Sequence, residues 1–283
     1  MKSISPNYAK EVMARYGLST KKHLGQNFLI DNNTIKKIVS VGDLKEDETV
    51  VEIGPGLGAM TGYLAEQAGQ VVCVELDREL VPVLNEVLAE FENVTIVQGD
   101  ALKTDFDRLV QDFGTVPYKV VANLPYYIST PLVMHLLTTG FDVKKLVLMV
   151  QKEVAQRMAA QPGTPEYGSL TVAVQYFCDC KVKFIVPPTV FVPKPAVESA
   201  VVELNLQPQP TVEVADREFF FQVVRAAFNK RRKTLSNALA NSPLKLDKTD
   251  VQDILVGMGL DNQVRGERLS IHQFAALTNQ LER

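Results

Sequence analysis

The sequence predicts an α/β protein with a mostly parallel sheet, followed by a small all-helical domain. Short β-branched runs at residues 48–54 (ETVVEIG), 70–76, 93–100 and 118–124 alternate with helix-like segments. Beyond residue 216 the patterns are helical only. Strands that alternate with helices need crossover connections, which produce a parallel sheet covered on both faces. We therefore expect an α/β domain over residues 1–206 and a helical domain over residues 207–283.

The connections between the first strands carry helical patterns. Residues 54–69 read as a glycine turn that enters a helix. After Asp77, apolar residues follow at positions 80, 83, 84, 87, 88 and 91, which is the spacing of a helix with one buried face. Pro82 leaves the first residue of that helix open. A further apolar strand is expected at residues 144–151.

The pattern changes between residues 171 and 206. The segments 171–188 (TVAVQYFCDCKVKFIVPP) and 198–206 predict two strands, a hairpin that completes the sheet. Residues 207–216 (QPQPTVEVAD) read as a linker, and one helical segment is expected over each of 217–240, 248–259 and 270–282. Ser270 is a candidate N-cap of the last helix, which has Ile271, Phe274, Ala275 and Leu281 on one side.

Composition restricts the class of protein. With 46% hydrophobic and 22% charged residues, the chain can bury a core. No apolar run approaches the roughly 18 residues of a membrane span, and the first residues lack an apolar signal core, so we expect a cytoplasmic protein. The few cysteines and histidines predict neither a disulfide framework nor a metal site; they are Cys73, Cys178, Cys180, His23, His135 and His272.

Charge is unevenly distributed along the chain. The net charge of −3 argues against a nucleic-acid partner, and residues 75–112 hold ten acidic residues against three basic ones. Residues 225–233 (RAAFNKRRK) instead hold five basic residues and no acidic one: Arg225, Lys230, Arg231, Arg232 and Lys233. Such a cluster creates a local positive field that suits phosphate, although a solvated helix face would have the same composition.

The glycine loop at residues 52–60 (EIGPGLGAM) predicts a nucleoside cofactor. Gly54 and Gly56 lie between a strand and a helix, where glycine lets a ligand approach the backbone, and Glu75 follows 21 residues beyond Gly54. An acid at that position accepts hydrogen bonds from ribose hydroxyls. Nicotinamide dinucleotides and S-adenosylmethionine both carry such a ribose, and a tight turn with no ligand is the simpler alternative.

Two further acids favour S-adenosylmethionine. Glu52 precedes the first glycine by two positions, and the Gly-x-Gly-x-Gly loop resembles the first motif of class I methyltransferases. Asp100 follows the third strand, where its carboxylate could accept a hydrogen bond from an adenine amino group. An isolated Gly-Asp is usually only a turn. These acids indicate a cofactor site because they follow the glycine loop in the order and spacing of a methyltransferase.

The stretch 121–131 (VANLPYYISTP) has the composition of a site for an amino group on a base. Asn123 offers a side-chain oxygen, and the Leu124 carbonyl precedes Pro125, which restricts it. Two such acceptors help to turn the lone pair of an exocyclic amine outward. Tyr126 offers a ring on which an unpaired base can stack. Alternatively, this is a packed turn before a helix that ends at Gly140, with Ser129 or Thr130 as cap and Pro131 at its first position.

Six segments together resemble the KsgA/RsmA family of ribosomal RNA adenine dimethyltransferases: 21–31 (KKHLGQNFLID), 51–61, 123–130 (NLPYYIST), 191–199 (FVPKPAVES), 228–239 (FNKRRKTLSNAL) and 266–270. The resemblance covers nearly the whole chain. It implies a Rossmann-like class I methyltransferase domain that transfers methyl groups from S-adenosylmethionine to N6 of two adjacent adenosines, in the 3′-terminal hairpin loop of small-subunit ribosomal RNA.

The resemblance also implies roles for individual residues. It places Asn27, Leu29, Gly54, Gly56, Glu75, Asp100 and Asn123 at the cofactor. It places Asn123 to Tyr126 at the reacting base, with Phe191 as a further stacking ring. The lysines that precede Asn27 could close over the cofactor or touch phosphate, and the basic cluster of residues 225–233 could bind RNA phosphates. The expected partner is the precursor of the small ribosomal subunit, and no feature demands a dimer.

Three other functions are compatible with parts of the sequence. A nicotinamide dehydrogenase explains the glycine loop and Glu75 but leaves Asn123 to Tyr126 unused. An RNA-binding assembly or transcription factor could keep the fold without the activity. A large-subunit RNA methyltransferase would share the residues around Asn123, although the C-terminal signatures favour the small-subunit enzyme.

Overall fold

The structure is a computed structural model that describes residues 6–18, 20–21, 24–230 and 232–282. The expected residues His23 and Arg231 lie outside these ranges. The chain forms two compact units. The first comprises residues 1–155 and 181–206, and the second comprises 156–180 and 207–283. The expected boundary at 206/207 is one of the points where the chain passes between units, and residues 156–180 also belong to the second unit.

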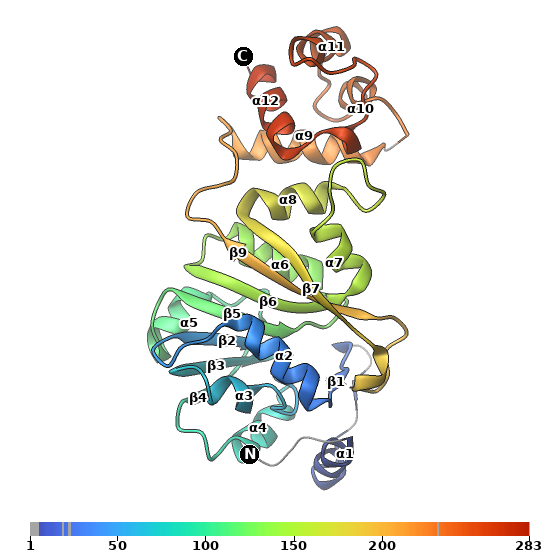
Figure 1. Cartoon of the computed structure of the whole chain (residues 1–283). Coiled ribbons are helices and arrows are strands. Elements are labelled where there is room, and N and C mark those ends of the chain that lie inside the picture. Colours follow the sequence, from blue (N-terminus) through green and yellow to red (C-terminus); the bar gives the residue numbers. More distant parts are fainter. Residues whose placement is uncertain (1–5, 19, 22–23, 231, 283) are drawn as a thin grey trace. The chain divides into compact units, whose positions relative to one another are not determined.

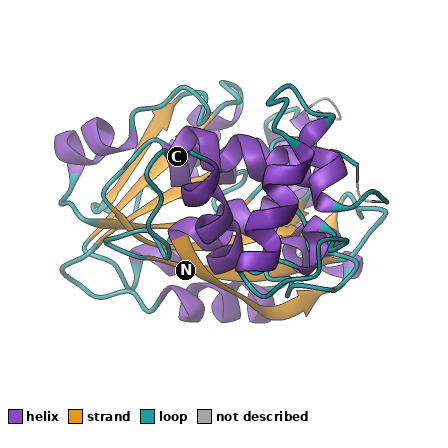
Figure 2. Ribbon diagram, turned by 90° about the horizontal axis from the view of Figure 1, so that it is seen from above, coloured by secondary structure: helices purple, strands orange, loops and turns teal. Residues whose placement is uncertain are grey.

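The first unit is built on a seven-stranded sheet in the order β4-β3-β2-β5-β6-β9-β7 (Figure 1). Its strands form one twisted layer (Figure 2). Five of them are mutually parallel, and β9 runs antiparallel to β6. Their bounds are β2 Thr49–Ile53, β3 Gln70–Glu75, β4 Val94–Gln98, β5 Tyr118–Asn123, β6 Val143–Gln151, β7 Cys178–Val186 and β9 Ser199–Leu206. The mostly parallel sheet is therefore confirmed.

Helices cover both faces of this sheet. Helix α2 packs on β5 and β6, and α3 packs on β3, through an apolar cluster that includes Ile35, Ile38 and Leu64. These helices lie in front of the sheet in Figure 1, and α6 lies behind it. The helices of this unit are α1 Pro6–Arg15, α2 Asn32–Gly42, α3 Thr61–Ala65, α4 Leu80–Val87, α5 Phe106–Phe113 and α6 Ser129–Thr138. The boundary between the two units falls within α7 Lys152–Met158.

Sequence order reverses at β2 in this sheet. The chain runs from β2 outward to β3 and β4, and then returns to β5 on the other side of β2. In open α/β sheets, ligands bind outside the carboxyl ends of the strands at such a reversal. A ligand site is therefore expected at the loops that follow β2, β3, β4 and β5.

A small two-stranded sheet fixes the segment that precedes α2. Strand β1 (Phe28–Leu29) pairs antiparallel with β8 (Phe191–Val192), so that Leu29 lies opposite Phe191. Asp31 then caps α2 by accepting a hydrogen bond from the Thr34 amide at 2.7 Å. The segment 24–29 is thus held at its C-terminal end by two neighbouring elements.

The second unit is helical. It contains α8 Ser169–Phe177, α9 Arg217–Asn229, α10 Leu235–Ala240, α11 Lys248–Gly257 and α12 Ile271–Leu281. Their apolar faces share one core around Phe220, Leu239 and Phe274. Ser270 caps α12 as predicted. Its hydroxyl accepts from the Gln273 backbone amide at 3.3 Å, and the Gln273 side-chain oxygen accepts from the Ser270 backbone amide at 2.8 Å.

Residues 169–177, of which 171–177 were predicted as strand, form helix α8 instead. The hydroxyl of Thr171 accepts a hydrogen bond from the Gly168 amide at 3.0 Å, which holds the first turn. Val172 and Tyr176 are buried in the core of the second unit. Because β-branched residues disfavour a helix by only a few tenths of a kcal/mol each, burial of this apolar segment decides its structure.

Three other expectations are corrected. Residues 217–240 form two helices, since Thr234 caps the start of α10. The expected linker 207–216 contributes buried Val212 to the second core and ends in Asp216, which caps α9. Helix α6 takes no side-chain cap from Ser129 or Thr130; the Ser129 hydroxyl donates to the Tyr126 carbonyl at 3.1 Å.

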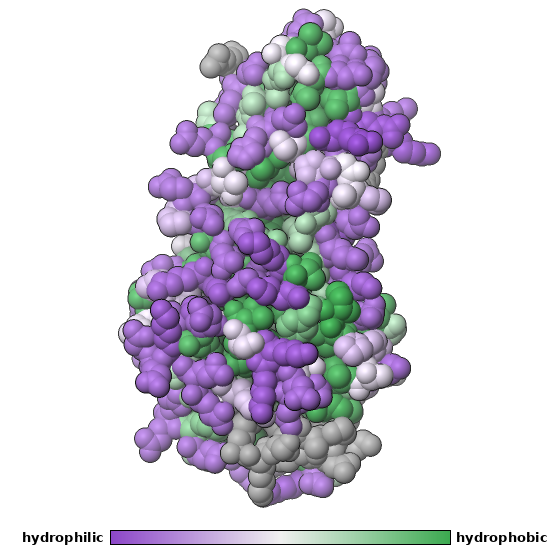
Figure 3. Space-filling view, in the orientation of Figure 1, coloured by the Kyte–Doolittle hydropathy of each residue, from purple (hydrophilic) through white to green (hydrophobic). Residues whose placement is uncertain are grey.

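The surface carries both polar and apolar side chains. On the face shown in Figure 3, hydrophilic residues cover much of the area and apolar residues are exposed between them. Among the described residues, no helix is long and apolar enough to cross a membrane.

Candidate active site

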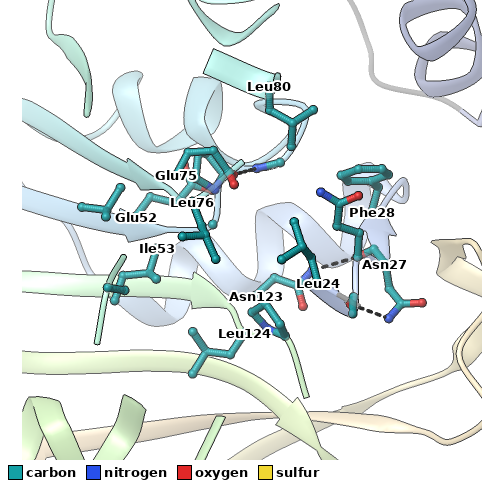
Figure 4. A pocket seen from close by; sticks show the side chains of 18 of the residues that line it. Leu24, Asn27, Phe28, Glu52, Ile53, Glu75, Leu76, Leu80, Asn123 and Leu124 are labelled. Carbon is teal, nitrogen blue, oxygen red and sulfur yellow. Dashed lines mark hydrogen bonds between the residues drawn. The ribbon is translucent and has the colours of Figure 1, made fainter. Parts of the chain in front are cut away.

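A pocket opens at the carboxyl ends of β2, β3, β4 and β5. Figure 4 shows side chains from the ends of β2, β3 and β5 and from the segment around Asn27 at this pocket. Ten of the residues predicted for cofactor and base line it: Asn27, Leu29, Gly54, Gly56, Glu75, Asp100, Asn123, Leu124, Pro125 and Tyr126. The structure therefore brings together residues that lie up to 99 positions apart, from 27 to 126.

The glycine loop leaves space for a ligand. Gly54 has φ +67°, and a Cβ added to it would meet no heavy atom within 4 Å. Gly56 has φ +62°, and there a Cβ would come within 3.0 Å of the Phe28 ring. Because Phe28 covers the loop so closely, glycine is needed at position 56 for both conformation and space.

Two carboxylates follow consecutive strands. Glu75, at the end of β3, accepts from the Gly56 amide at 3.2 Å and from the Asp77 amide at 2.8 Å. Burial raises the pKa of Glu75, and these backbone hydrogen bonds oppose the shift. Asp100, after β4, is held by the Leu102 amide at 3.1 Å. Together with apolar Leu76 and Ala101, these acids suit a nucleoside, whose hydroxyls and amino group donate and whose base is flat.

A third acid, Glu52, is buried beneath the loop. Its carboxylate accepts a hydrogen bond from the Thr61 hydroxyl at 2.6 Å, and only 1% of the residue is exposed. Burial raises the pKa of Glu52 to about 7, although the bond from Thr61 favours the charged form. This carboxyl group therefore titrates near neutral pH.

Asn123 ends β5 and is oriented by the N-terminal segment. Its side-chain nitrogen donates to the Asn27 carbonyl at 3.1 Å, which leaves the Oδ1 atom as the acceptor end of the amide. The Leu124 amide donates to the Met149 carbonyl of β6 at 3.1 Å. Among the described residues none donates to the Leu124 carbonyl. Asn123 Oδ1 and the Leu124 carbonyl are thus consecutive acceptors at the pocket, and each residue is held by a hydrogen bond to a backbone carbonyl.

The tyrosines of the same turn have different surroundings. Tyr126 is half-buried, and its hydroxyl lies 2.7 Å from the Ser199 Oγ atom at the start of β9. Tyr127 also lines the pocket but is 52% exposed. Its ring lies next to Gly25, where an added Cβ would come within 3.1 Å of it. Sequence reasoning assigned no role to Tyr127 or Ser199, although they lie in the family-like segments 123–130 and 191–199. No local pattern indicates that Ser199 is the partner of Tyr126.

Two groups of predicted residues lie elsewhere. Phe191 is 3% exposed, and it packs in the core cluster of the first unit rather than in the pocket, so its burial does not favour base stacking. The basic residues Arg225, Lys230, Arg232 and Lys233 are all exposed in the second unit. Arg231 lies outside the described residues.

Comparison with known proteins gives a consistent result. The model of the family described as ribosomal RNA adenine dimethylase matches residues 17–282. A protein of Pelotomaculum thermopropionicum named ribosomal RNA small subunit methyltransferase A is 51% identical over 97% of this chain and 96% of its own length. A protein of the same name from Moorella thermoacetica is 49% identical over 98% of both chains.

Solved structures share the fold. A dimethyladenosine transferase from Plasmodium falciparum superposes with a TM-score of 0.75 at 27% identity, covering 88% of this chain and 95% of that one. The 23S rRNA methyltransferase ErmE superposes with a TM-score of 0.71 at 26% identity, covering 91% of this chain and 100% of its own.

Proposed function

The chain belongs to the ribosomal RNA adenine dimethylase family, and from this premise we propose that it transfers methyl groups from S-adenosylmethionine to N6 of two adjacent adenosines in the 3′-terminal loop of small-subunit ribosomal RNA. The proposed product is a pair of N6,N6-dimethyladenosines. The proposed substrate is the precursor of the small subunit in the cytoplasm, and the enzyme acts as a monomer.

One observation carries the proposal. Asn123 Oδ1 and the Leu124 carbonyl are adjacent acceptors in the same pocket as the glycine loop, Glu75 and Asp100. An acid pair beside a glycine loop suits any adenine nucleoside cofactor. The two acceptors fit a second adenine, whose exocyclic amine presents two N–H donors.

Different residues of the pocket would recognise different parts of the cofactor. Glu75 would accept from the ribose hydroxyls and Asp100 from the adenine amino group. The open space over Gly54 would admit the rest of the molecule to the loop. When bound, S-adenosylmethionine would supply a methyl carbon on a sulfonium: the aligned amine attacks this carbon in line, the C–S bond breaks, the neutral thioether leaves, and the amine loses a proton to water.

The residues at the base prepare the amine for attack. Its lone pair is delocalised into the purine ring and is a weak nucleophile until the N–H bonds are turned. Hydrogen bonds to Asn123 Oδ1 and the Leu124 carbonyl would turn them and stabilise the positive charge that develops on N6. Tyr126, whose hydroxyl is held by Ser199, would stack on a base that has been swung out of the RNA. Alignment of this kind needs no nucleophilic side chain.

The alternatives predict different binding and products. A dehydrogenase would bind a nicotinamide dinucleotide and not S-adenosylmethionine in calorimetry. An assembly factor would bind small-subunit precursors and transfer no labelled methyl group. A large-subunit enzyme, such as the 23S rRNA methyltransferase ErmE, would modify large-subunit RNA.

Methyl transfer to three substrates tests the proposal. The full-length protein is incubated with labelled cofactor and undermethylated small subunits, large subunits or an adenosine-free loop analogue. We expect label in the small subunits alone. Label in large subunits alone, or in none of the three despite bound cofactor, would contradict the proposed function.

A further inference from the structure

The acid Asp77 lies two residues beyond Glu75 and is almost completely buried, with 4% of its side chain exposed. The Lys21 ammonium group lies 2.7 Å from its Oδ1 atom, and the Gln26 amide donates to its Oδ2 atom at 2.9 Å. The Lys21 backbone amide also donates to the Gln26 side-chain oxygen at 2.8 Å. Lys21, Gln26 and Asp77 thus form a closed set of contacts, which we call the Asp77 latch.

The latch joins both sides of the pocket. Through its backbone amide, Asp77 donates to the Glu75 carboxylate at 2.8 Å. Gln26 is followed by Asn27, whose carbonyl accepts from the Asn123 side chain at 3.1 Å. The segment 24–29 is therefore anchored at the end of β3 by Asp77 and at the end of β5 by Asn123. Phe28, on the same segment, lies against Gly56 of the glycine loop.

Asp77 and Lys21 both remain charged in the latch, because each stabilises the charge of the other. Burial opposes the charged form of Asp77, but the hydrogen bonds from Lys21, Glu79 and Gln26 outweigh it and keep the pKa of the Asp77 carboxyl below its ordinary value. The hydrogen bonds to Asp77 and Glu79 raise the pKa of Lys21. Without Lys21, Asp77 keeps only the hydrogen bonds from the Gln26 side chain and the Glu79 amide. Because a buried carboxylate without its cation is unfavourable, Asp77 should then take up a proton or move towards water, and either change weakens its hold on residues 24–29.

We propose that Asp77 is a positioning residue that holds residues 24–29 closed over the pocket, and that it thereby couples cofactor binding at Glu75 to the orientation of Asn123. The part that concerns the cofactor rests on the proposed function. The Lys21 ammonium group contacts Asp77 and also Glu79, at 2.9 Å. We therefore assign it to the latch.

Hydrogen exchange in the cofactor-free, full-length protein tests the latch itself. We compare wild type, Asp77→Asn, Lys21→Met and the double variant, and measure amide exchange in residues 24–29. Each single variant should speed exchange there by about tenfold, and the double variant should add little, because both changes remove one shared interaction. Lys21, whose side chain is 24% exposed, provides a variant that folds even where Asp77→Asn does not.

The ion pair between Arg15 and Glu86 provides a matched control. At 2.7 Å it joins α1 to α4, so it also connects the N-terminal part of the chain to the body of the unit. Both side chains are largely exposed, and neither lines the pocket. Glu86→Gln should leave exchange in residues 24–29 at the wild-type rate.

Cofactor affinity and kinetics test the coupling. Lys21→Met should weaken binding of S-adenosylmethionine about tenfold and should also lower kcat at saturating cofactor, because Asn123 loses its fixed partner. Lys21→Arg should restore both. A merely structural defect would reduce the folded fraction and leave the KM of the folded enzyme unchanged.

Two results would overturn the proposal: unchanged exchange in residues 24–29 of both single variants, or faster exchange with unchanged cofactor affinity and kcat. If wild type itself binds no S-adenosylmethionine, the proposed function fails, and the exchange rates still decide whether the latch exists.

Discussion

The side-chain amide of Asn123 donates a hydrogen bond to the backbone carbonyl of Asn27, 3.1 Å away and 96 positions earlier in the chain. This contact determines which end of the amide remains to accept. It also means that the acceptor proposed for the target base is oriented by residues 24–29, which line the cofactor pocket. The base and cofactor sites therefore share this segment, and a substitution in one site should change binding or turnover at the other.

Asn123→Ala tests the acceptor. We expect kcat to fall by about 10²–10³, the usual effect of removing one oriented hydrogen-bonding group from a site of charge development. RNA affinity, measured by filter binding, should be nearly unchanged. Asn205→Ala, an amide on β9 that does not line the pocket, serves as control. Lost RNA binding with normal turnover of the bound complex would refute the assigned role.

Two substitutions at Tyr126 separate the contribution of its ring from that of its hydroxyl. Tyr126→Phe removes only the contact with Ser199 and should have a small effect on kcat/KM. Tyr126→Ala removes the stacking surface, worth about 1–3 kcal/mol per base, and should raise the KM for RNA by about tenfold or more. Equal losses in both variants would show that the hydroxyl, and not the ring, is what matters.

Glu75→Gln tests the ribose acceptor. The change keeps the size of the side chain and removes its charge. Because hydrogen bonds to charged groups contribute about 1.5–3 kcal/mol, calorimetry should give a Kd for S-adenosylmethionine about 10–100 times higher. Unchanged cofactor affinity would show that Glu75 does not accept hydrogen bonds from the ribose hydroxyls.

The exposed basic residues of the second unit should add affinity without sequence choice. Replacing Arg225, Lys230, Arg232 and Lys233 with glutamine should weaken RNA binding and flatten its dependence on salt by about 0.7–0.9 per lost phosphate contact. Glutamine at four exposed basic positions of the first unit that do not line the pocket, Lys37, Lys45, Arg108 and Lys144, is the matched control. An unchanged salt slope in the four-residue variant would exclude this surface.

Glu52 should make stability depend on pH. Burial raises its pKa to about 7 in the folded protein, whereas the unfolded value is near the ordinary 4.5. The folded state then binds more protons between these values, so the free energy of unfolding should fall as pH rises from about 4.5 to 7, by up to about 3 kcal/mol. Glu52→Gln, which can still accept from Thr61, should flatten this part of the denaturant-derived profile. A Gln variant with the same slope as wild type would assign the dependence to another group.

Sequence alone predicted the parallel sheet and the glycines and acids of the pocket, because these depend on short-range signals. Only the family resemblance placed Asn27 and Leu29 there. The β-branched strands, the glycine turn and the acids after β3 and β4 each lie within a few residues of the feature that they specify. Helix α8 was missed because Val172 and Tyr176 follow a strand-like pattern, and only burial in the second unit selects the helix.

Partners distant in sequence could not be predicted. Nothing in the residue type of Ser199 indicates that it holds the Tyr126 hydroxyl, or in Asp77 that it binds Lys21 and Gln26. The same limit explains Phe191. Its motif placed it near the reacting base, but pairing with Leu29 directs it to the core. Such contacts depend on tertiary packing, which local patterns do not encode.

The most direct measurement is to incubate the protein with undermethylated small ribosomal subunits and labelled S-adenosylmethionine, and then to map every modified nucleotide. We predict label on N6 of two neighbouring adenosines in the 3′-terminal loop, up to two methyl groups on each. Methylation at any other atom or in another RNA, or none at all with cofactor bound, would contradict the assignment of this pocket.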